Sequence, residues 1–277
     1  MNVLASCHGR SLDLSHPRIM GILNITPDSF SDGGRFFNTD DALRQVEKML
    51  AEGADIIDIG GESTRPGAQT VSVDQELARV IPLIERLRAE SEAFISVDTS
   101  KATVMREAVA AGADIINDVC ALREHEAVET AAVLQTPVCL MHMQGEPRNM
   151  QHQPEYQDVV VEVTAFLEAR IDACEKAGIA REQIIIDPGF GFGKTLAHNL
   201  ALFRQLPDLQ SFGLPILVGV SRKSMIDAVL DIPVQERMPA SVALAGLAVW
   251  LGASIIRTHD VRETFDAVKM CHAVVNG

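Results

Sequence analysis

The chain lacks the features that mark several large classes of protein. Its five cysteines are scattered and never form a CxxC pair, which argues against a disulfide framework and indicates reduced thiols. No apolar run approaches the ~18 residues of a membrane span, and Met1 to Arg18 show no secretory signal. A net charge of −14 argues against a general nucleic-acid binder, which needs a basic face. We therefore expect a cytoplasmic globular protein with neither a membrane nor a nucleic-acid partner.

Common catalytic and nucleotide-binding motifs are missing as well. The eight histidines form neither HExxH nor a cluster with cysteine, and no Ser-His-Asp or Cys-His arrangement is evident. Gly193-Lys194-Thr195 ends like a Walker phosphate loop, but Pro188 stands where that pattern requires glycine. Glycines alternate strictly over residues 189–193, which is not the spacing of the dinucleotide fingerprint. We therefore expect neither a zinc site nor a nucleotide-binding loop.

The chain does contain a repeated pattern, in which a β-branched run ends on a polar side chain. Such runs are followed by Asp58, Asp98, Asn117, Asp187 and the triplet Arg257-Thr258-His259. Three runs share a preface, namely Gly53-Ala54-Asp55, Gly112-Ala113-Asp114 and Gly252-Ala253-Ser254. A buried parallel strand reads as a continuous apolar run, and α/β proteins place their sites at the carboxyl ends of such strands. The pattern therefore predicts an α/β enzyme.

Strands and helices are predicted to alternate along the chain. The strands are expected at 19–25, 56–60, 94–98, 115–118, 138–142, 184–187, 216–219 and 255–258. The helices are expected at 40–52, 73–90, 101–111, 124–134, 158–177, 197–206, 223–230 with 240–251, and 261–275. Eight such pairs in about 250 residues are typical of a (β/α)8 TIM barrel, and a doubly wound open sheet is the alternative.

Local signals agree with these boundaries. Ser72 with Gln75 predicts a capping box for the second helix. Glycines fall where helices should end, at Gly53, Gly112, Gly178 and Gly252. No linker divides the chain, so residues 1–277 are predicted to form one domain, with 1–18 covering the bottom of a barrel over 19–277.

Three predicted loops carry groups that suit an anionic ligand. Arg65 lies between glycines in the second loop and could grip phosphate or carboxylate, although a solvated Arg in a turn is the alternative. The seventh loop, Ser221-Arg222-Lys223-Ser224, offers hydroxyls, cations and backbone N–H groups at the start of a helix. The eighth strand brings Arg257 and His259 to the same end of the barrel, where phosphate is often held. An ion pair with Asp260 is the alternative for these two residues.

The first loop is the candidate for a lid and for a metal site. It carries one aromatic residue, Phe30, together with Asp32 and two glycines, and an ordinary connecting turn is the alternative. Mg²⁺ needs only one or two side-chain oxygens besides phosphate and water, and Asn24 with Asp32 could supply them. His142 ends the fifth strand, where we expect a structural role.

Three polar side chains at the ends of different strands carry the sharpest prediction. Asp98, Asn117 and Asp187 combine two acceptors with an amide, which suits a planar heterocycle bearing several N–H groups. Lys223 adds a donor for a carbonyl oxygen or ring nitrogen. Helix capping is the alternative for each aspartate, and it is strongest for Asp98, which Thr99 and Ser100 follow.

Taken together, these loops closely resemble the bacterial dihydropteroate synthase family, over roughly residues 10–275. The longest matching segments are residues 20–34 (MGILNITPDSFSDGG), 60–67 (GGESTRPG) and 187–194 (DPGFGFGK). Shorter ones are Ser96-Val97-Asp98-Thr99, Ile116-Asn117-Asp118, Leu140-Met141-His142, Ser221-Arg222-Lys223-Ser224 and Arg257-Thr258-His259-Asp260. The resemblance implies a condensation of 6-hydroxymethyl-7,8-dihydropterin diphosphate with 4-aminobenzoate, assisted by Mg²⁺.

The resemblance also implies a role for individual residues. The pterin would contact Asp98, Asn117, Val119, Met141, Asp187, Phe192, Gly219 and Lys223. The diphosphate would meet Asn24, Thr64, Arg65, Arg257 and His259, with Mg²⁺ on Asn24 and Asp32. The aminobenzoate, and sulfonamide inhibitors in its place, would lie near Thr64, Arg65, Pro66, Phe192, Lys223 and Ser224.

Two other classes remain open as alternatives. A pterin-dependent methyltransferase barrel would share the inner aspartates and asparagine, but it would not need Arg257 and His259. A non-catalytic pterin-binding paralogue would be expected to lose the first loop or Lys223, and both are intact. The family is usually homodimeric, and the apolar helix after residue 240 suits a homodimer. Asp58 has no ligand role in this scheme, and we expect it to be structural, beneath the second loop.

Overall fold

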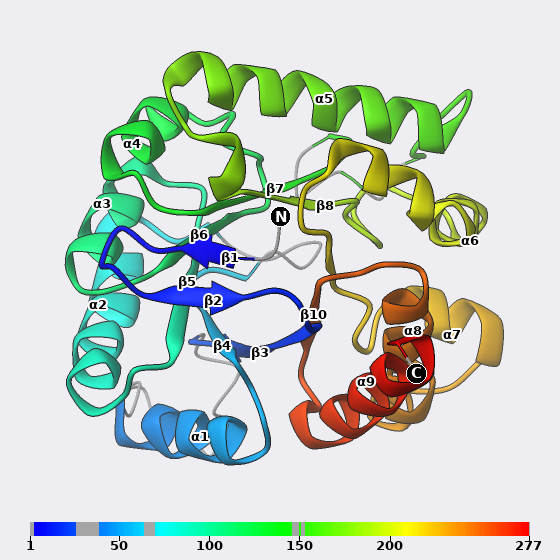
Figure 1. The fold of residues 1–277 in the computed structure, drawn as a ribbon, viewed down its shortest axis with the longest axis horizontal. Coiled ribbons are helices and arrows are strands. Elements are labelled where there is room, and N and C mark those ends of the chain that lie inside the picture. Colours follow the sequence, from blue (N-terminus) through cyan, green and yellow to red (C-terminus); the bar gives the residue numbers. More distant parts are fainter. Residues whose placement is uncertain (1–2, 26–38, 64–69, 146–149, 151–152, 277) are drawn as a thin grey trace.

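Eight parallel strands form a barrel inside a ring of helices (Figure 1). The structure is a computed structural model and describes residues 3–25, 39–63, 70–145, 150 and 153–276. The barrel strands are β3 (Arg18–Asn24), β4 (Ile56–Gly60), β5 (Phe94–Asp98), β6 (Ile115–Asp118), β7 (Val138–Met141), β8 (Ile184–Asp187), β9 (Leu217–Val218) and β10 (Ile255–Thr258). The helices are α1 (Thr39–Ala51), α2 (Val73–Glu90), α3 (Ala102–Ala110), α4 (Ala127–Leu134), α5 (Val159–Ala177), α6 (Leu196–Arg204), α7 (Ser224–Leu230), α8 (Met238–Trp250) and α9 (Val261–Asn276). Short 3-10 turns lie at η1 (Arg181–Gln183), η2 (Leu206–Phe212) and η3 (Val234–Glu236).

The barrel closes between β8 and β9. The strand order is β8-β7-β6-β5-β4-β3-β10-β9, and each neighbouring pair is parallel. Ile186 pairs with Ile216, just before β9, and its N–H donates to the Pro215 carbonyl at 3.0 Å. The open-sheet alternative is therefore wrong, and all eight strands end at one end of the barrel, called the carboxyl end below.

Side chains alternate between the barrel interior and the surrounding helices, as in any barrel strand. The lowest interior layer is an apolar cluster of Met20, Ile56, Phe94, Ile115, Cys139, Ile185, Leu217 and Ile255. Their neighbours along the strands, such as Ile57, Ile95 and Ile256, belong instead to the larger core under the helices. Two residues further along, the interior position is polar in five of the eight strands, at Asp58, Ser96, Asn117, Asp187 and Arg257. This alternation places the polar strand-end residues inside the carboxyl end.

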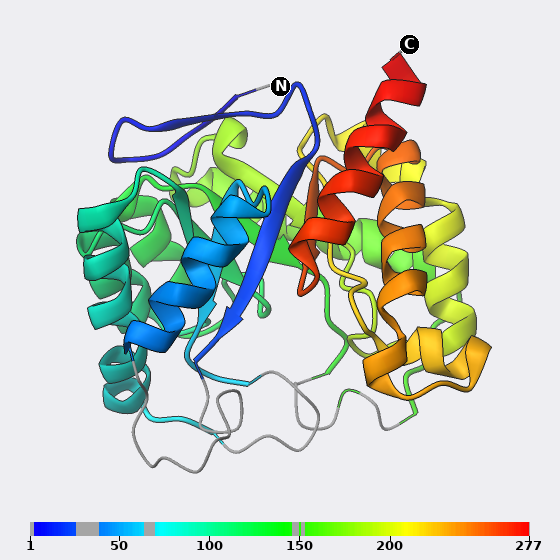
Figure 2. The same cartoon turned by 90° about the horizontal axis from the view of Figure 1, so that it is seen from below.

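A hairpin covers the opposite end of the barrel (Figure 2). Its strands, β1 (Val3–Ala5) and β2 (Ser11–Asp13), are antiparallel and were not among the predicted strands. Leu4 and Leu12 are buried in the lowest apolar layer of the barrel. The prediction that the first residues cover the barrel bottom is thus confirmed.

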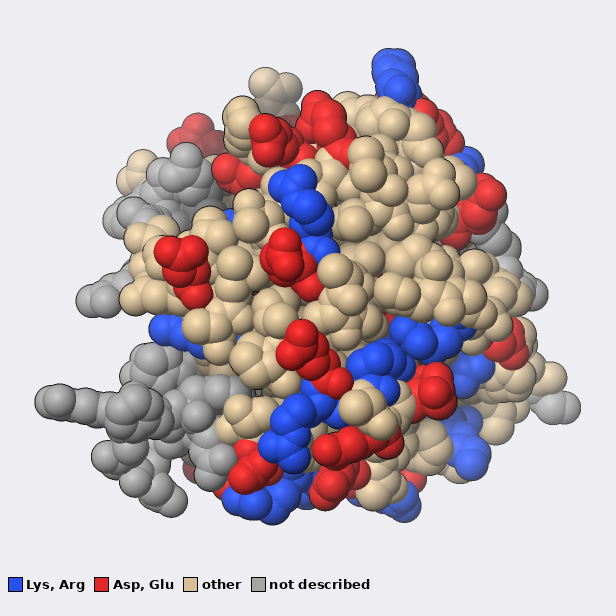
Figure 3. Space-filling view, turned by 90° about the vertical axis from the view of Figure 1, so that its left-hand side faces the viewer, with Lys and Arg blue, Asp and Glu red and all other residues tan. Residues whose placement is uncertain are grey.

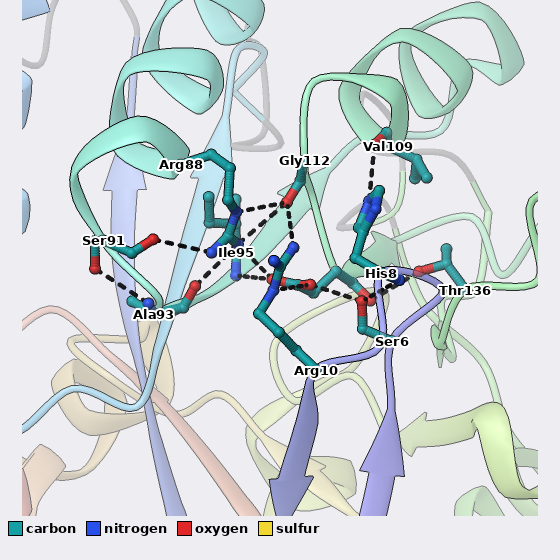
Figure 4. Close-up of polar contacts among 11 residues, drawn as sticks. Ser6, His8, Arg10, Arg88, Ser91, Ala93, Ile95, Val109, Gly112 and Thr136 are labelled. Atoms are coloured by element: carbon teal, nitrogen blue, oxygen red, sulfur yellow. Dashed lines mark hydrogen bonds and ion pairs between the residues drawn. The ribbon is translucent and has the colours of Figure 1, made fainter.

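Asp114 ties this hairpin to the barrel wall. The carboxylate is completely buried and accepts hydrogen bonds from Ser6 Oγ (2.7 Å), Arg10 Nε (2.9 Å) and Arg88 Nη2 (2.6 Å). It also accepts from the backbone N–H of Ile95 at 3.0 Å, within the network that Figure 4 shows. With two guanidinium partners and a backbone donor, the buried charge is fully paired.

The repeated Gly-Ala-Asp preface has the same physical purpose in both places where it occurs. Asp55 Oδ2 accepts from the N–H of Ile19, the second residue of β3, at 2.9 Å, and its other oxygen pairs with Arg18. Asp114 does the same for Ile95 in β5. The preceding glycines, Gly53 and Gly112, have positive φ, which lets the chain leave the helix and enter the strand. The preface therefore fixes the amino-terminal ends of neighbouring strands.

Most predicted element boundaries agree with the structure within two residues. The predicted capping box is present, with Gln75 N donating to Ser72 Oγ at 3.2 Å and the Gln75 side chain accepting from Ser72 N. The fourth helix begins at Ala127 rather than residue 124, because Glu126 adopts a left-handed conformation.

The side of the molecule that carries α2, α3 and α4 has acidic and basic side chains next to one another (Figure 3). Arg86, for example, pairs with Asp40 at 2.6 Å and with Glu90 at 3.6 Å. Among the described residues, no helix is long and apolar enough to cross a membrane.

Candidate active site

Polar side chains from several strands converge inside the carboxyl end of the barrel. Asp98, Asn117 and Asp187 are nearly buried there, with exposed fractions of 8%, 5% and 7%. Asp98 lies opposite Asn117 in the β5–β6 pairing, and Asp187 lies opposite Met141 in the β7–β8 pairing. The structure thus brings together the three residues that we predicted for a heterocycle edge.

Arg257 lies at the centre of this group and contacts two carboxylates. Its Nε donates to Asp58 Oδ2 at 2.6 Å, and its Nη2 donates to Asp98 Oδ2 at 2.8 Å. Asn117 Nδ2 also donates to Asp58 Oδ2, at 3.2 Å. We call these four residues, Asp58, Asp98, Asn117 and Arg257, the central network.

The structural role expected for Asp58 agrees with its contacts. It is fully buried inside the barrel, one interior layer below Gly60, the residue with which the second loop begins, and it pairs with Arg257. Among the described residues, its Oδ1 and the neighbouring Ser96 Oγ have no hydrogen-bond partner. Because Met20, Ile56 and Phe94 mark the interior positions, the two-residue alternation from Ile56 to Asp58 could have placed this carboxylate from the sequence.

Burial dominates the electrostatics of the central network. It raises the pKa of Asp98 to about 7, against the opposing effect of Arg257 and with the help of Asp58. Burial likewise raises the pKa of Asp187, while Lys223 and the N–H of Gly189 lower it. The pKa of Arg257 is raised by its two aspartates despite burial, so the guanidinium stays charged. The site therefore holds a permanent cation close to Asp98 and Asp187, whose raised pKa values make these two carboxyl groups resist ionisation.

Lys223 faces the site from the start of α7. Its Nζ donates to the Phe190 carbonyl and lies 4.3 Å from the centre of the Phe192 ring. Burial lowers the pKa of Lys223 to about 8, although Asp187 opposes that shift. Phe192 packs against an apolar group of Val119, Cys120, Met141, Met143 and Met150, which provides a flat apolar wall next to the polar edge.

His259 and Arg222 are held beside the end of β10. His259 N and Nδ1 both contact Ser221 Oγ, at 3.2 and 3.0 Å. The predicted alternative for this region, an ion pair of Arg257 or His259 with Asp260, is wrong, because Arg222 pairs with Asp260 through Nε (2.9 Å) and Nη2. Ser224 is exposed at the first residue of α7, and Gly219 is buried next to the Arg257 side chain.

Several predicted site residues lie outside the described residues. These are Phe30, Asp32, Thr64, Arg65 and Pro66. Asn24 is described, and it ends β3 beside Gly60, where a Cβ added to the glycine would lie 3.4 Å from Asn24 Oδ1 and 3.5 Å from Asp98 Cβ. An amide oxygen at this position is a suitable ligand for Mg²⁺, which takes few protein oxygens and otherwise phosphate and water. Within the described ranges, no group of three or more His, Cys, Asp or Glu residues could hold a metal ion.

The capping alternative for the aspartates does not hold for Asp98. The N-cap of α3 is Lys101, which makes no side-chain cap. Asp187 does accept a local hydrogen bond, from Gly189 N to Oδ1 at 2.7 Å, but Gly189 begins a loop and not a helix. Asp118, whose side chain points away from the interior, accepts from Cys120 N and Leu122 N, and burial raises its pKa to about 7.

Lys194 is a charged residue of this region to which we had assigned no role. It is 4% exposed, and its Nζ lies 2.8 Å from His142 Nδ1 and 2.8 Å from the Gly189 carbonyl. Burial and Lys194 lower the pKa of His142 to about 2, so the imidazole is neutral and accepts. Burial lowers the pKa of Lys194 to about 7. The structural role expected for His142 agrees with these contacts.

Comparisons with known proteins decide the family. The family described as pterin binding enzyme matches residues 20–259. The dihydropteroate synthase of Haemophilus influenzae is 56% identical over 269 residues, which cover 97% of this chain and 98% of the relative. The chain belongs to the dihydropteroate synthase family.

Solved structures of this family agree with the fold throughout. A Yersinia pestis dihydropteroate synthase in complex with a sulfonamide drug superposes with a TM-score of 0.95 at 52% identity, covering 99% of this chain and 100% of that one. A Xanthomonas albilineans dihydropteroate synthase with 4-aminobenzoic acid gives a TM-score of 0.93 at 49% identity, covering 99% and 98%. The (β/α)8 barrel predicted from the sequence is therefore confirmed.

Proposed function

We propose that this protein joins 6-hydroxymethyl-7,8-dihydropterin diphosphate to 4-aminobenzoate, giving 7,8-dihydropteroate and diphosphate for folate biosynthesis. The C–O bond to diphosphate breaks, the amine nitrogen forms the new C–N bond, and the amine releases one proton. The observation that carries the proposal is the convergence of Asp98, Asn117, Asp187 and Lys223 at one end of the barrel. The identity to dihydropteroate synthases along nearly the whole chain supports it.

The pterin ring is the ligand that this group of side chains suits best. Asp98 and Asp187 would accept from its ring and amino N–H groups, while the Asn117 amide and Lys223 would meet its oxygen and remaining nitrogens. Val119, Met141, Phe192 and Gly219 would lie against its faces. The electron-rich ring can delocalise the positive charge that develops when diphosphate leaves, so no side-chain nucleophile is required.

The diphosphate would be bound by Asn24, Thr64, Arg65, Arg257 and His259. Arg257 is suited to this role because its guanidinium remains charged and is held in place by the buried carboxylates of Asp58 and Asp98. Asn24 would hold Mg²⁺ together with Asp32. Bound Mg²⁺ would offset the charge that develops on the departing diphosphate.

The second substrate would bind after the first. The aminobenzoate would contact Thr64, Arg65, Pro66, Phe192, Lys223 and Ser224, and sulfonamides would compete with it there. The bound Xanthomonas albilineans and Yersinia pestis complexes support these two ligand classes. Phe30 and Asp32 of the first loop would then complete the pocket over the diphosphate.

A direct assay tests the activity. Purified protein is mixed with the pterin diphosphate, 4-aminobenzoate and Mg²⁺, and dihydropteroate is followed by chromatography. Product formation that stops when Mg²⁺ is chelated supports the proposal. Tight pterin binding without product would indicate the non-catalytic paralogue. Methyl transfer to or from a methylated pterin, with no dihydropteroate, would indicate the methyltransferase alternative.

We expect kcat/KM for the pterin diphosphate to show a narrow bell-shaped pH profile with its maximum near pH 7. Asp98 must lose its proton to accept from the ring, and because its pKa is raised to about 7, activity rises about tenfold per pH unit below that value. Above the maximum, Lys194 and Lys223, with pKa values near 7 and 8, lose their charge and activity falls. Asp98→Asn should remove the contribution of Asp98 to the acid limb, which Asp187, whose pKa is also raised by burial, then sets alone. A flat profile between pH 5.5 and 8 would contradict these assignments.

We also propose that the protein is a homodimer through α7, α8 and α9. Large apolar side chains are exposed there, namely Val229, Leu230, Leu247, Trp250, Met270 and Val274. Exposed apolar side chains gathered on neighbouring helices are typical of an interaction surface, and a second copy of the same surface can cover them. Sedimentation should give twice the monomer mass, and Leu247→Glu should yield monomers. Val133→Glu, on the exposed α4 surface, is the control and should stay dimeric.

A further inference from the structure

We propose that Lys194 is a positioning residue, which fixes Lys223 and Phe192 through the backbone of residues 188–195, called the β8 loop below. The proposal rests on the proposed function, because it concerns how tightly the pterin ring is held. Lys194 itself does not reach the ring. It acts on two groups that do.

Lys194 gathers acceptors from both sides of the β8 loop. Its Nζ lies 2.8 Å from the Gly189 carbonyl and 3.0 Å from the Phe192 carbonyl, and 2.8 Å from Nδ1 of His142, which follows β7. A fourth acceptor, the His142 carbonyl, is 3.4 Å away. An ammonium has three donors, and each finds a buried acceptor here, so the loop is fixed to the barrel wall by one side chain.

The loop has little freedom to replace this contact. Gly189 has φ +68°, and a Cβ there would overlap the His142 carbonyl oxygen. Gly193 has φ +60°, and a Cβ there would lie 2.5 Å from the Gln144 carbonyl oxygen. Tyr156 OH donates to the Gly193 carbonyl at 2.8 Å, and Gly191 N donates to Asn199 Oδ1 at 2.7 Å. The backbone thus packs directly on the end of β7, and Lys194 satisfies the two carbonyls that face inward.

The same loop holds Lys223 in place. Lys223 Nζ donates to the Phe190 carbonyl and lies 4.3 Å above the Phe192 ring. The Phe190 side chain is fully buried and packs on Phe203 of α6, at 5.3 Å between ring centres, so it cannot follow a shift of the backbone easily. Lys194 binds the carbonyls on both sides of Phe190, at Gly189 and Phe192. Loss of the Lys194 hydrogen bonds would let the Gly189 and Phe192 carbonyls reorient. The Phe190 carbonyl and the Phe192 ring would then turn away from Lys223.

A ligand-binding cycle tests the proposal. The affinity for 6-hydroxymethyl-7,8-dihydropterin, without diphosphate, is measured by calorimetry for Lys194→Met, Lys223→Met and the double variant. We expect losses of about 30-fold for Lys194→Met and about 100-fold for Lys223→Met, in the range of one or two lost charge-assisted hydrogen bonds. The double variant should lose little more than Lys223→Met alone, because residues that act as a unit are not additive. The proposal would be overturned if the fold-loss of the double variant equalled the product of the two single losses. It would also be overturned if Lys194→Met bound the pterin as tightly as the wild type.

Controls separate this result from unfolding and from failure of the proposed function. Lys176→Met, at an exposed position of α5, should leave affinity unchanged. If Lys194→Met does not fold, Asn199→Ala removes the hydrogen bond between Gly191 of the same loop and α6, and it should show the same dependence on Lys223. Hydrogen exchange of the Gly191 and Phe192 amides needs neither ligand nor turnover, and it should be at least about tenfold faster in Lys194→Met. Unchanged exchange refutes the positioning role even if the wild type is an active synthase, whereas an inactive wild type refutes the function alone.

Discussion

Arg257→Met should lower the free energy of unfolding by about 3–5 kcal/mol near pH 8, the usual cost of leaving a buried charge without its partner. Arg257 pairs at 2.6 Å with Asp58, which is fully buried, and at 2.8 Å with Asp98. Asp98 can adapt by binding a proton, since losing Arg257 removes the cation that opposes its raised pKa. Denaturant unfolding followed by circular dichroism measures the change.

A second substitution distinguishes charge from packing. Asp58→Asn in the Arg257→Met background removes the stranded carboxylate and keeps its volume, so most of the lost stability should return. Arg262→Met is the matched control, because Arg262 is 58% exposed and pairs only on the surface with Asp266 at 3.2 Å, where a change of about 0–1 kcal/mol is expected. A double variant as unstable as Arg257→Met would show that the guanidinium matters through packing instead.

Activity should not return with stability. If Arg257 binds the diphosphate, both Arg257→Met and the double variant should lose at least about 100-fold in kcat/KM. Their affinity for the pterin diphosphate should fall far more than their affinity for the free pterin. Equal losses for the two ligands in calorimetry would remove Arg257 from the diphosphate site and leave it a structural counter-ion.

The interior of the barrel could largely be predicted from the sequence, because two sequence patterns occur together: apolar runs, and a polar residue at the end of a run. Apolar runs located the strands, and the polar residue at the end of each run marked the carboxyl end. Asp98, Asn117 and Asp187 were located in this way. Asp58 obeys the same alternation one layer deeper, but the end-of-run pattern alone does not distinguish a residue in contact with ligand from one that supports it.

Other features depend on contacts that no short pattern encodes. The partners of Asp114 lie 104 and 108 positions away at Arg10 and Ser6, and the hairpin that carries them has strands of only three residues. Asp260 pairs with Arg222, which lies 38 positions away and has a left-handed backbone with φ 56°, whereas Arg257 pairs with Asp58 and Asp98. Lys194 belonged to a quoted motif, yet its role depends on His142, which is 52 positions away.

Asp187→Asn should reduce kcat/KM for the pterin diphosphate by about 10³–10⁵-fold while changing stability by less than about 1 kcal/mol. Asparagine keeps the volume, and its Oδ1 can still accept from Gly189 N, which lies 2.7 Å from Asp187 Oδ1. The second carboxylate oxygen is replaced by an NH2 group. This group donates hydrogen bonds, but the edge of the pterin that it would face also consists of N–H donors. A site that recognises its ligand by hydrogen bonds loses kcat/KM by factors of this size when one of its buried polar groups has no suitable partner on the ligand.

Two further readouts make this test specific. Asp187 raises the pKa of Lys223, so its neutralisation should move the alkaline limb of the pH profile to lower pH. Asp55→Asn is the matched control, because Asp55 also pairs with a cation, Arg18 at 2.9 Å, but at the opposite end of the barrel. That variant should keep the wild-type kcat/KM and pH profile even where it loses stability. If Asp187→Asn binds free pterin as tightly as the wild type, the carboxylate does not read the ring, and the selectivity of the site must come from Asp98 and Asn117.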